Sequence, residues 1–396
     1  MKPIDACVLF STADWDAPYW TNKQHTAKNL ALKGIKVLYI ESIGLRRPKI
    51  TSSIDIGRIF RRLFRVIQGV HQVDQNIYVL SPLIIPFKHH WFLVRWFNQA
   101  FLRVLINHFI KRIQIRGGAC NPIVWAYHPY AFDSIPKDSN WPVIYHCVDD
   151  LSAVPGIDGK AFNLVEQDFL KHVDVVFTTS ATLYEKCRPF SDNIYNFPNV
   201  VDFEHFSQEA DSSKAPRDLE SIPHPRIGYV GVLSDFKIDF ELLFEVVKLS
   251  PQWQFIFIGE EREGQSSLLV AKLKLEPNVH FLGYRKYADL PMYMSRIDVA
   301  ILPTLINSYT KSMFPMKYFE YISAGLPVVS TPLDFLQEHS AGVLMGRNAK
   351  TFVDAIVKQL NSGKISAHQA ANIVGDNTWV SRLDKMINCI EGVKLK

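Results

Sequence analysis

Lys317 and Glu320 stand three residues apart in the segment 311–331, KSMFPMKYFEYISAGLPVVST. Pro315 suits the start of a helix, and Ser312 just before it can supply a capping oxygen. A helix start offers unpaired N–H groups, so Lys317 in the first turn favours a nearby anion such as a phosphate. Glu320, one turn later, is placed to accept hydrogen bonds from hydroxyl groups. The spacing predicts a surface that reads phosphate and sugar together; the alternative is an amphipathic helix whose Lys and Glu are solvated.

Asp149 and Asp150 form a second chemical candidate, directly after the apolar run Val143–Val148. That run reads as a buried strand, and ligands of parallel α/β sheets bind at the carboxyl ends of the strands. One carboxylate there could take a proton from an acceptor hydroxyl, while its neighbour caps the turn that follows. We expect Asp149 to be the base, with Asp150 as the second choice. The alternative is that both only cap the chain from Leu151 onward.

The elements that must position these residues alternate between strands and helices, which predicts parallel α/β sheets. The polar, Ser-, Asp- and Pro-rich segment 207–225 reads as a linker between two doubly wound domains. Neither domain has G-x-G-x-x-G after its first strand, so a dinucleotide-dependent oxidoreductase is disfavoured. The expected strands are Ala6–Phe10, Lys36–Ile40, Pro122–Tyr127, Val143–Val148, Val173–Thr178 and Ile194–Phe197 before the linker, and Arg226–Val232, Trp253–Gly259, Val279–Leu282, Val299–Pro303 and Leu326–Thr331 after it.

The composition bounds the class of protein. With 396 residues and 47% hydrophobic content, the chain can fill two packed cores. The five cysteines are widely spaced, which indicates neither a disulfide framework nor a zinc site and fits a reducing cytoplasm. The N-terminus lacks a signal-peptide pattern, and no run of eighteen uncharged apolar residues occurs.

Positive charge is concentrated in one region of the chain. Thirteen Lys and Arg stand against two Asp between residues 45 and 116, a net +11 in a chain of net +5. Within it, Trp91–Ile113 reads as an amphipathic helix, and Arg58–Ile67 repeats the mixture of basic and apolar residues. This pattern favours an anionic membrane surface, contacted by Arg95, Arg103 and Lys111. The alternatives are core packing with solvated arginines, and nucleic acid, for which no recognised module is present.

The donor-helix pattern P-M-K-x-x-E-Y-x-x-x-G-x-P-V-V at 315–329 resembles the nucleotide signature of GT-B glycosyltransferases. The resemblance implies that Glu320 holds the ribose hydroxyls of a nucleotide sugar. It also implies that Met316 and Lys317 contact the diphosphate, as in bacterial inverting enzymes of the xanthan glucuronosyltransferase type. Many retaining members carry another Glu eight residues before the one that matches Glu320. This chain has Ser312 at that position, so the resemblance favours inversion.

Further segments extend the resemblance over nearly the whole chain. GYVGVLSDFK, residues 228–237, resembles the turn that opens the donor domain and adds Gly231 and Lys237, with Ser312, to the expected nucleotide site. Val232 stands where retaining enzymes have a phosphate-binding Arg. The base-side region 281–303 implies that Tyr284 lies near the nucleobase. The xanthan-type resemblance also puts the catalytic Asp in the loop of Asp149 and Asp150.

The acceptor side is expected in the first domain. His25 in the first predicted helix and His128 after the strand ending at Tyr127 could orient acceptor or phosphate, or could be structural. Asp14-Trp15-Asp16 has the D-x-D form of the GT-A metal motif, but the nucleotide-binding strands that precede that motif are missing. We interpret Asp14 and Asp16 as polar residues of a loop that contacts the acceptor, in which Trp15 and Trp20 would stack on sugar rings. We expect no metal and no other cofactor. Ordinary loop capping is the alternative.

Together these patterns predict an α/β protein of the GT-B class, with two Rossmann-like domains facing across a cleft. We expect an acceptor domain at 1–206, a linker at 207–225, a nucleotide-sugar domain at 226–375, and a C-terminal helix at 376–396 that packs back towards the first domain. The predicted function is transfer of a sugar from a nucleotide-diphosphate sugar to a saccharide or glycolipid acceptor of a bacterial surface polysaccharide. The expected location is cytoplasmic, at the inner face of the membrane. The alternatives are a sugar-nucleotide epimerase and a non-catalytic membrane adaptor.

Overall fold

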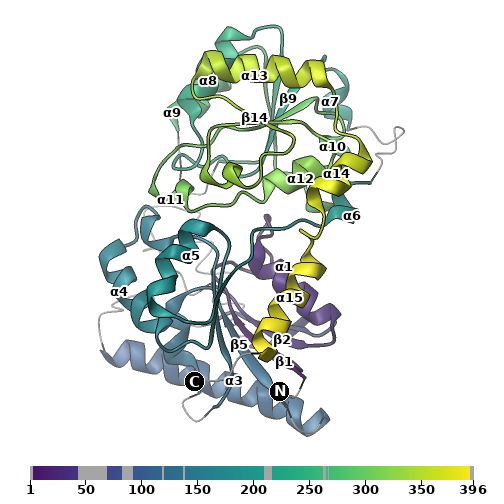
Figure 1. The fold of residues 1–396 in the computed structure, drawn as a ribbon. Helices are drawn as coiled ribbons and strands as arrows, with labels where there is room; N and C mark the ends of the chain where they lie inside the picture. The colour runs from purple at the N-terminus through teal and green to yellow at the C-terminus, as the bar shows by residue number, and fades with distance from the viewer. Residues whose placement is uncertain are drawn as a thin grey trace. The chain divides into compact units, whose positions relative to one another are not determined.

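The computed structural model describes residues 3–42, 69–82, 92–117, 120–136, 139–208, 216–261, 265 and 267–392. The chain divides into two compact units. The first contains Met1–Phe197 and Val380–Lys396, and the second contains Pro198–Trp379. Each unit is built around a mostly parallel sheet with helices on both faces, as Figure 1 shows. The predicted α/β class is therefore confirmed.

The described part of the first unit contains an eight-stranded sheet in the order β3-β4-β2-β1-β5-β6-β7-β8. All of its strand pairs are parallel except β3 with β4. This edge pair was not predicted. β3 is a short polar segment, HQVD, and β4, IYVL, is an apolar run of only four residues that sequence reasoning missed. The strands are β1 (Ala6–Phe10), β2 (Lys36–Ile40), β3 (His71–Asp74), β4 (Ile77–Leu80), β5 (Pro122–Ala126), β6 (Val143–Cys147), β7 (Val175–Thr178) and β8 (Ile194–Asn196).

Alternate residues of β1 point into two separate cores, as expected for a strand covered on both faces. Val8 and Phe10 lie in a core with apolar residues of α3, α4 and α5, whereas Cys7 and Leu9 lie in a core with residues of α1 and α15. The helices of this unit are α1 (Asn22–Leu32), α3 (Phe92–Gly117), η1 (Pro129–Ser134), η2 (Leu151–Ala153), α4 (Gly159–Leu170), α5 (Ala181–Cys187), η3 (Arg188–Phe190) and, except for its first residue, α15 (Trp379–Gly392).

The second unit contains, in its described residues, a six-stranded parallel sheet in the order β11-β10-β9-β12-β13-β14. Five strands were predicted, and β14 is the addition, since its three residues are too short to give a sequence signal. The strands are β9 (Arg226–Val230), β10 (Gln254–Ile258), β11 (Val279–Gly283), β12 (Val299–Leu302), β13 (Val328–Ser330) and β14 (Val343–Met345).

Helices cover both faces of this second sheet. Residues of α10, α12 and α14 share one core, and residues of α8, α9 and α13 share the other. Figure 1 shows α8 beside α13 and α12 beside α14. The helices are α6 (Phe203–Phe206), α7 (Arg217–Glu220), α8 (Phe240–Leu249), α9 (Leu268–Leu273), η5 (Tyr287–Asp289), α10 (Leu290–Met294), α11 (Ser308–Lys311), α12 (Lys317–Ser323), η6 (Asp334–Gln337), α13 (Ala349–Ser362) and α14 (Ala367–Val374).

The donor helix α12 corrects one prediction. It begins at Lys317, two residues after Pro315, and its N-cap residue is Met316 without a capping side chain. Ser312 does not cap it: this residue ends α11, and its hydroxyl donates to the carbonyl of Tyr309 at 2.8 Å. Ser312 is the C-cap residue of α11, a helix that was not predicted, and it therefore lies before the start of α12. The predicted end is confirmed, because Gly325 follows the C-cap with a left-handed φ of 73°.

Helix α3 confirms the predicted amphipathic helix but extends to Gly117. Its apolar side packs in the core of the first unit through residues Leu102, Ile106, Phe109, Ile110 and Ile113. The second predicted segment of this kind, 58–67, lies outside the described residues. None of the described helices is long and apolar enough to cross a bilayer.

Candidate functional site

The predicted site residues of the first unit cluster where parallel strands end. Asp149 and Asp150 follow β6, His128 follows β5, and Trp15 lies in the loop after β1. In the register of the sheet, Phe10 pairs with Ala126 and Ala126 pairs with Tyr145, so these loops leave the same edge. Ligands of such sheets bind at this edge.

Asp149 and Asp150 turn to different partners. The Oδ2 atom of Asp149 lies 3.8 Å from Nζ of Lys23, which lies in the first turn of α1. The Oδ1 atom of Asp150 accepts from Nζ of Lys186 at 2.8 Å, from the backbone N–H of Ser152 at 3.1 Å and from its hydroxyl at 2.6 Å. Asp150 therefore caps η2, as predicted for one of the two carboxylates.

The environment of Asp150 makes it a weak base. Burial raises its pKa, but the hydrogen bonds from Lys186 and Ser152 outweigh that effect and hold the pKa below its ordinary value. Lys186 also pairs with Oε2 of Glu166 at 2.7 Å, and Tyr145 donates to Oε1 of Glu166 at 2.5 Å. Burial lowers the pKa of Lys186, but Glu166 and Asp150 together raise it above its ordinary value. Asp150 thus belongs to a structural ion network.

Three predicted acceptor-side residues lie together. The rings of Trp15 and Trp20 are 5.2 Å apart, and the ring of Trp20 meets His25 edge to face at 5.5 Å. Trp15 is held from its backbone, because its N–H donates to Oε1 of Glu41 at 2.8 Å. This arrangement forms an aromatic wall beside the first turn of α1.

His128 is more deeply buried than the other predicted residues of this unit. Its side chain is 1% exposed, and neither ring nitrogen has a hydrogen-bond partner among the described residues. The ring of Phe10 lies edge-on at 6.3 Å. Burial lowers the pKa of His128 to about 4, so the ring is neutral at physiological pH.

Sequence reasoning missed the polar network beneath Asp149. Nζ of Lys23 lies 5.5 Å from the ring centroid of Tyr127, whose hydroxyl donates to the carbonyl of Asn22 at 3.1 Å and lies 2.8 Å from Oγ1 of Thr26. Nδ1 of His146 lies 3.2 Å from the same hydroxyl. No local pattern marks Lys23, since its importance arises only when α1 meets the loop after β6.

The predicted donor residues of the second unit also meet. A Cβ atom added to Gly231, at the end of β9, would lie 3.1 Å from Cε of Lys317. Nζ of Lys317 donates to Oε2 of Glu320 at 2.9 Å. The side chain of Glu320 is 7% exposed and that of Lys317 is 27% exposed. The alternative of a solvated Lys and Glu is therefore wrong for Glu320.

Two tyrosines support this arrangement. The hydroxyl of Tyr321 accepts from the N–H of Val230 at 2.9 Å, which ties α12 to the end of β9. Tyr287, missed by sequence reasoning, lies near Glu320: burial raises its pKa, and Glu320 raises it further. The ring of His205 stacks on Tyr287 at 4.3 Å. A Tyr in the predicted base-side region 281–303 was the available signal.

The other predicted donor residues occupy neighbouring loops. Nζ of Lys237 lies 4.8 Å from the ring centroid of Tyr309 in α11. Tyr284 follows β11 and is half-buried, as is Met316 beside α12. Ser312 is 2% exposed. The carbonyl of Met316 accepts from the N–H of Glu320 at 3.3 Å, so this residue belongs to the start of α12.

The predicted membrane residues lie on α3. Arg103 is half-buried and its guanidinium donates to the carbonyl of Asp133, so it does not face outward. Lys111 is exposed. Arg95 lies in the helix, but its side chain is outside the described part of the chain.

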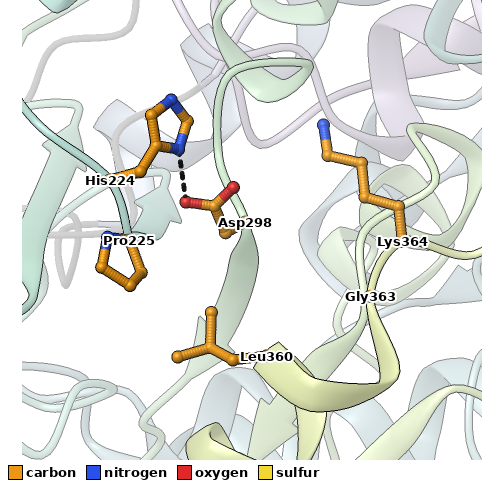
Figure 2. A pocket seen from close by; sticks show the side chains of 6 residues that line it. All are labelled: His224, Pro225, Asp298, Leu360, Gly363 and Lys364. Atoms are coloured by element: carbon orange, nitrogen blue, oxygen red, sulfur yellow. Dashed lines mark hydrogen bonds and ion pairs between the residues drawn. The ribbon is translucent and has the colours of Figure 1, made fainter.

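Two further features lie apart from these clusters. The structure, within its described residues, holds no group of three or more His, Cys, Asp or Glu side chains suited to a metal ion, so Asp14 and Asp16 form no such group. A pocket of about 360 Å³, seen in Figure 2, is lined by His224, Pro225, Asp298, Leu360, Gly363 and Lys364. Because Pro225 and Asp298 directly precede β9 and β12, this pocket lies at the amino ends of the strands, away from Lys317.

Comparison with known proteins bears on both units. The family model described as glycosyl transferases group 1 matches residues 224–362. TuaH of Bacillus subtilis strain 168, named as a teichuronic acid biosynthesis glycosyltransferase, is 29% identical over 224 residues. That match covers 52% of this chain and 55% of TuaH, so it spans about half the length of this relative.

Several solved structures are similar over the whole chain. Sucrose-phosphate synthase from Thermosynechococcus elongatus has a TM-score of 0.69 at 16% identity, with 98% of each chain covered. HepE of Anabaena, solved with UDP and glucose, has a TM-score of 0.64 at 14% identity, covering 98% of this chain and 99% of its own. At these identities the likeness shows the fold. Residues 224–362 are therefore similar to the glycosyl transferases group 1 family, and the fold of the chain is that of GT-B glycosyltransferases.

Proposed function

We propose that this protein transfers a sugar from a nucleotide-diphosphate sugar to a saccharide or glycolipid acceptor. The observation that carries the proposal is the close approach of Lys317 to Gly231, beside the buried Glu320, in the part of the chain that the family model matches. Lys317 would pair with the diphosphate, and Glu320 would accept from ribose hydroxyls. HepE, of the same fold, was solved with UDP, with UDP and glucose and with UDP-glucose, which supports a nucleotide sugar as the donor.

The proposed base is Asp149 rather than Asp150. Oδ1 of Asp150 already accepts three hydrogen bonds, and its lowered pKa makes proton uptake unfavourable. A general base must lie within hydrogen-bond reach of the proton that it accepts, and its pKa must suit proton uptake. Asp149 would take the proton as the acceptor oxygen attacks the anomeric carbon, and the diphosphate would leave with the electrons of the broken bond.

We favour inversion of configuration. Ser312 stands where many retaining members have a carboxylate, and it is buried with its hydroxyl donating to Tyr309. The negative charge of the leaving diphosphate would be stabilised by Lys317 and by backbone N–H groups, so the proposal includes no required metal.

The test is a transfer assay with UDP, GDP and dTDP sugars, each with saccharide, glycolipid and sugar-phosphate acceptors, read by mass spectrometry. We expect a glycosylated acceptor and free nucleoside diphosphate, with a CMP sugar inactive because it lacks the diphosphate. NMR of the product should show a β linkage from an α donor. An isomerised free donor would instead identify an epimerase, and binding without turnover would identify an adaptor.

We also propose that α3 attaches the protein to an anionic membrane. Its outward face carries apolar side chains, with Phe101 37%, Val104 65% and Ile115 86% exposed. On a helix these positions share one side with His108 and Arg112, and all lie opposite the buried Ile106 and Ile113. Mixed basic and apolar faces of this kind bind the interface of anionic bilayers.

Co-sedimentation with vesicles tests the attachment. The wild type should bind phosphatidylglycerol vesicles and not phosphatidylcholine vesicles. Lys111→Glu with Arg112→Glu should abolish binding, because each basic residue near the surface contributes about 1 kcal/mol. Lys160→Glu with Lys171→Glu makes the same change of charge at exposed positions outside α3 and should leave binding intact. If both double variants lose vesicle binding equally, binding depends on the net charge of the protein and not on α3.

A further inference from the structure

Lys23 is a buried cation in the first turn of α1. The residue is 7% exposed, and lysines are almost never buried to this extent without a counter-charge. Its Nζ faces the Oδ2 of Asp149 at 3.8 Å and the ring of Tyr127 at 5.5 Å. Burial lowers the pKa of Lys23, and Asp149 partly reverses that effect. The ammonium and the carboxylate therefore stabilise each other at the carboxyl edge of the sheet.

The groups around Lys23 give its ammonium a fixed position. Tyr127 directly after β5 and His146 in β6 lie together, with Nδ1 of His146 3.2 Å from the hydroxyl of Tyr127. Burial lowers the pKa of His146, and the charges of Arg382 in α15 and of Lys23 lower it further. Burial lowers the pKa of Arg382 to about 10, and Tyr127 partly opposes that change. Asp149 supplies a negative charge beside these cations and rings.

The first turn of α1 is also anchored from below. Nη2 of Arg382 donates to Oδ1 of Asn22 at 2.7 Å, and Tyr127 donates to the backbone carbonyl of the same residue. Lys33, at the other end of α1, pairs with Asp384. Helix α15 thus contacts both ends of α1, the helix that carries Lys23. These contacts fix the position of the backbone from which the ammonium extends.

We propose that Lys23 is the positioning residue of Asp149, holding its carboxylate in the orientation that accepts the proton of the acceptor hydroxyl. The inference rests on the proposed function. In the step, the acceptor oxygen bonds to the anomeric carbon as its proton moves to Asp149, and the bond to the diphosphate breaks with its electron pair. Lys23 neither gives nor takes a proton. The pair of Lys186 and Asp150 has the same charges but a capping role.

The kinetic test is a double-mutant cycle. Lys23→Met should lower kcat for transfer roughly 10- to 100-fold with the donor KM nearly unchanged, because only the orientation of the base is lost. Lys23→Arg should recover part of that loss, since it keeps the charge. In an Asp149→Asn background, Lys23→Met should have no further effect on kcat. Equal losses in both backgrounds would overturn the inference.

Lys28→Met is the matched control. Lys28 lies on the same helix and pairs with Asp74 at 2.5 Å, but its side chain is 37% exposed. Removing it also breaks a Lys–Asp pair of α1, so a general loss of helix stability would lower kcat in both variants. We expect Lys28→Met to keep the wild-type kcat.

A measurement of stability tests the contact without activity. Burial lowers the pKa of Lys23 in the folded protein, so keeping its ammonium charged there destabilises the fold. This destabilisation is complete below the folded pKa, and it disappears as the pH rises to the unfolded pKa of 10.5. Lys23→Met in each background isolates the part of the pH dependence that Lys23 causes. Asp149→Asn removes the counter-charge, so the rise of the urea midpoint between pH 8 and 10 that Lys23 causes should be larger in the Asp149→Asn background than in the wild type. An equal rise in both backgrounds would overturn the ion pair.

These results separate the inference from the function. If Asp149→Asn keeps wild-type transfer, Asp149 is not the base and the proposed mechanism fails. If Asp149→Asn loses transfer while Lys23→Met keeps the wild-type kcat, the mechanism stands and the role of Lys23 is wrong.

Discussion

Gly231 and Lys317 are in contact although they come from different elements: a Cβ atom on Gly231 would lie 3.1 Å from Cε of Lys317. The same atom would lie 3.2 Å from the hydroxyl of Tyr229. Gly231 also has a φ of 147°, which side chains rarely adopt. The absence of a side chain at Gly231 therefore leaves the space that the side chain of Lys317 occupies at the end of β9.

Gly231→Ala should weaken nucleotide binding at least 10-fold, because the methyl group displaces Lys317. The backbone strain should also cost about 1–3 kcal/mol of stability. Isothermal titration with UDP, GDP and dTDP measures the affinity. Gly363→Ala is the control, since Gly363 has a φ of 72° but no neighbouring atom within 4 Å of the added Cβ. It should lose stability and keep nucleotide affinity.

Lys317→Met and Glu320→Gln should affect different parts of the nucleotide. The first should reduce affinity for a nucleoside diphosphate about 10- to 100-fold, through the loss of a charge-assisted contact. The second should reduce the preference for a ribonucleotide over its 2′-deoxy form. Binding of UDP, dUDP and uridine to each variant distinguishes the two effects. Lys350→Met, at an exposed position of α13, should change neither.

Asp149→Asn should lower kcat about 10²- to 10⁴-fold, as expected for a general base. Asp150→Asn should instead cost about 1–3 kcal/mol of stability, because Lys186 loses a hydrogen-bonded partner. Asp150 has a lowered folded pKa, so its contribution is present above the unfolded pKa and is lost as the pH falls through the folded value. Urea unfolding at pH 7 and pH 3 measures it. The reverse pattern, a dead but stable Asp150→Asn, would exchange the two roles.

The buried His128 should make the protein less stable in mild acid. The unfolded chain takes up a proton near pH 6.5, but the folded ring resists protonation to about pH 4, so stability falls between these values. The loss is at most about 3 kcal/mol for this group. His128→Phe, which removes the titrating ring beside Phe10, should flatten the urea midpoint between pH 6.5 and 4.5. An unchanged slope would place the acid sensitivity elsewhere.

Removal of divalent metal should leave transfer unchanged, because the proposed mechanism assigns the charge of the diphosphate to Lys317 and backbone N–H groups. The measurement is the initial rate of transfer in EDTA, compared with the rate after adding Mg²⁺ or Mn²⁺. The control is a metal-dependent glycosyltransferase in the same buffer. A rate that collapses in EDTA and returns with Mn²⁺ would show that a metal shares the site.

Much of this architecture follows from local sequence. The strands β1, β2, β5, β6, β9, β10 and β12 are mainly apolar, which is typical of strands that are covered on both faces of a parallel sheet. Gly325 ends α12 because its left-handed φ suits a residue without a side chain. Asp150 caps η2 through a contact two residues away. Each of these features depends on neighbours along the chain, so the sequence predicts it.

The partners of the chemical groups depend on long-range packing. The sequence favours Asp149 over Asp150 but names no partner for either. Only the meeting of β6 with α1 on one side and α5 on the other gives them Lys23 and Lys186 as different partners. Likewise, Arg103 looks like a surface residue until α3 packs beside η1 and turns it to Asp133. Periodicity specifies which face of a helix is apolar. Which charged groups meet is set by the register and crossing of elements far apart in the chain, and only the tertiary structure decides that.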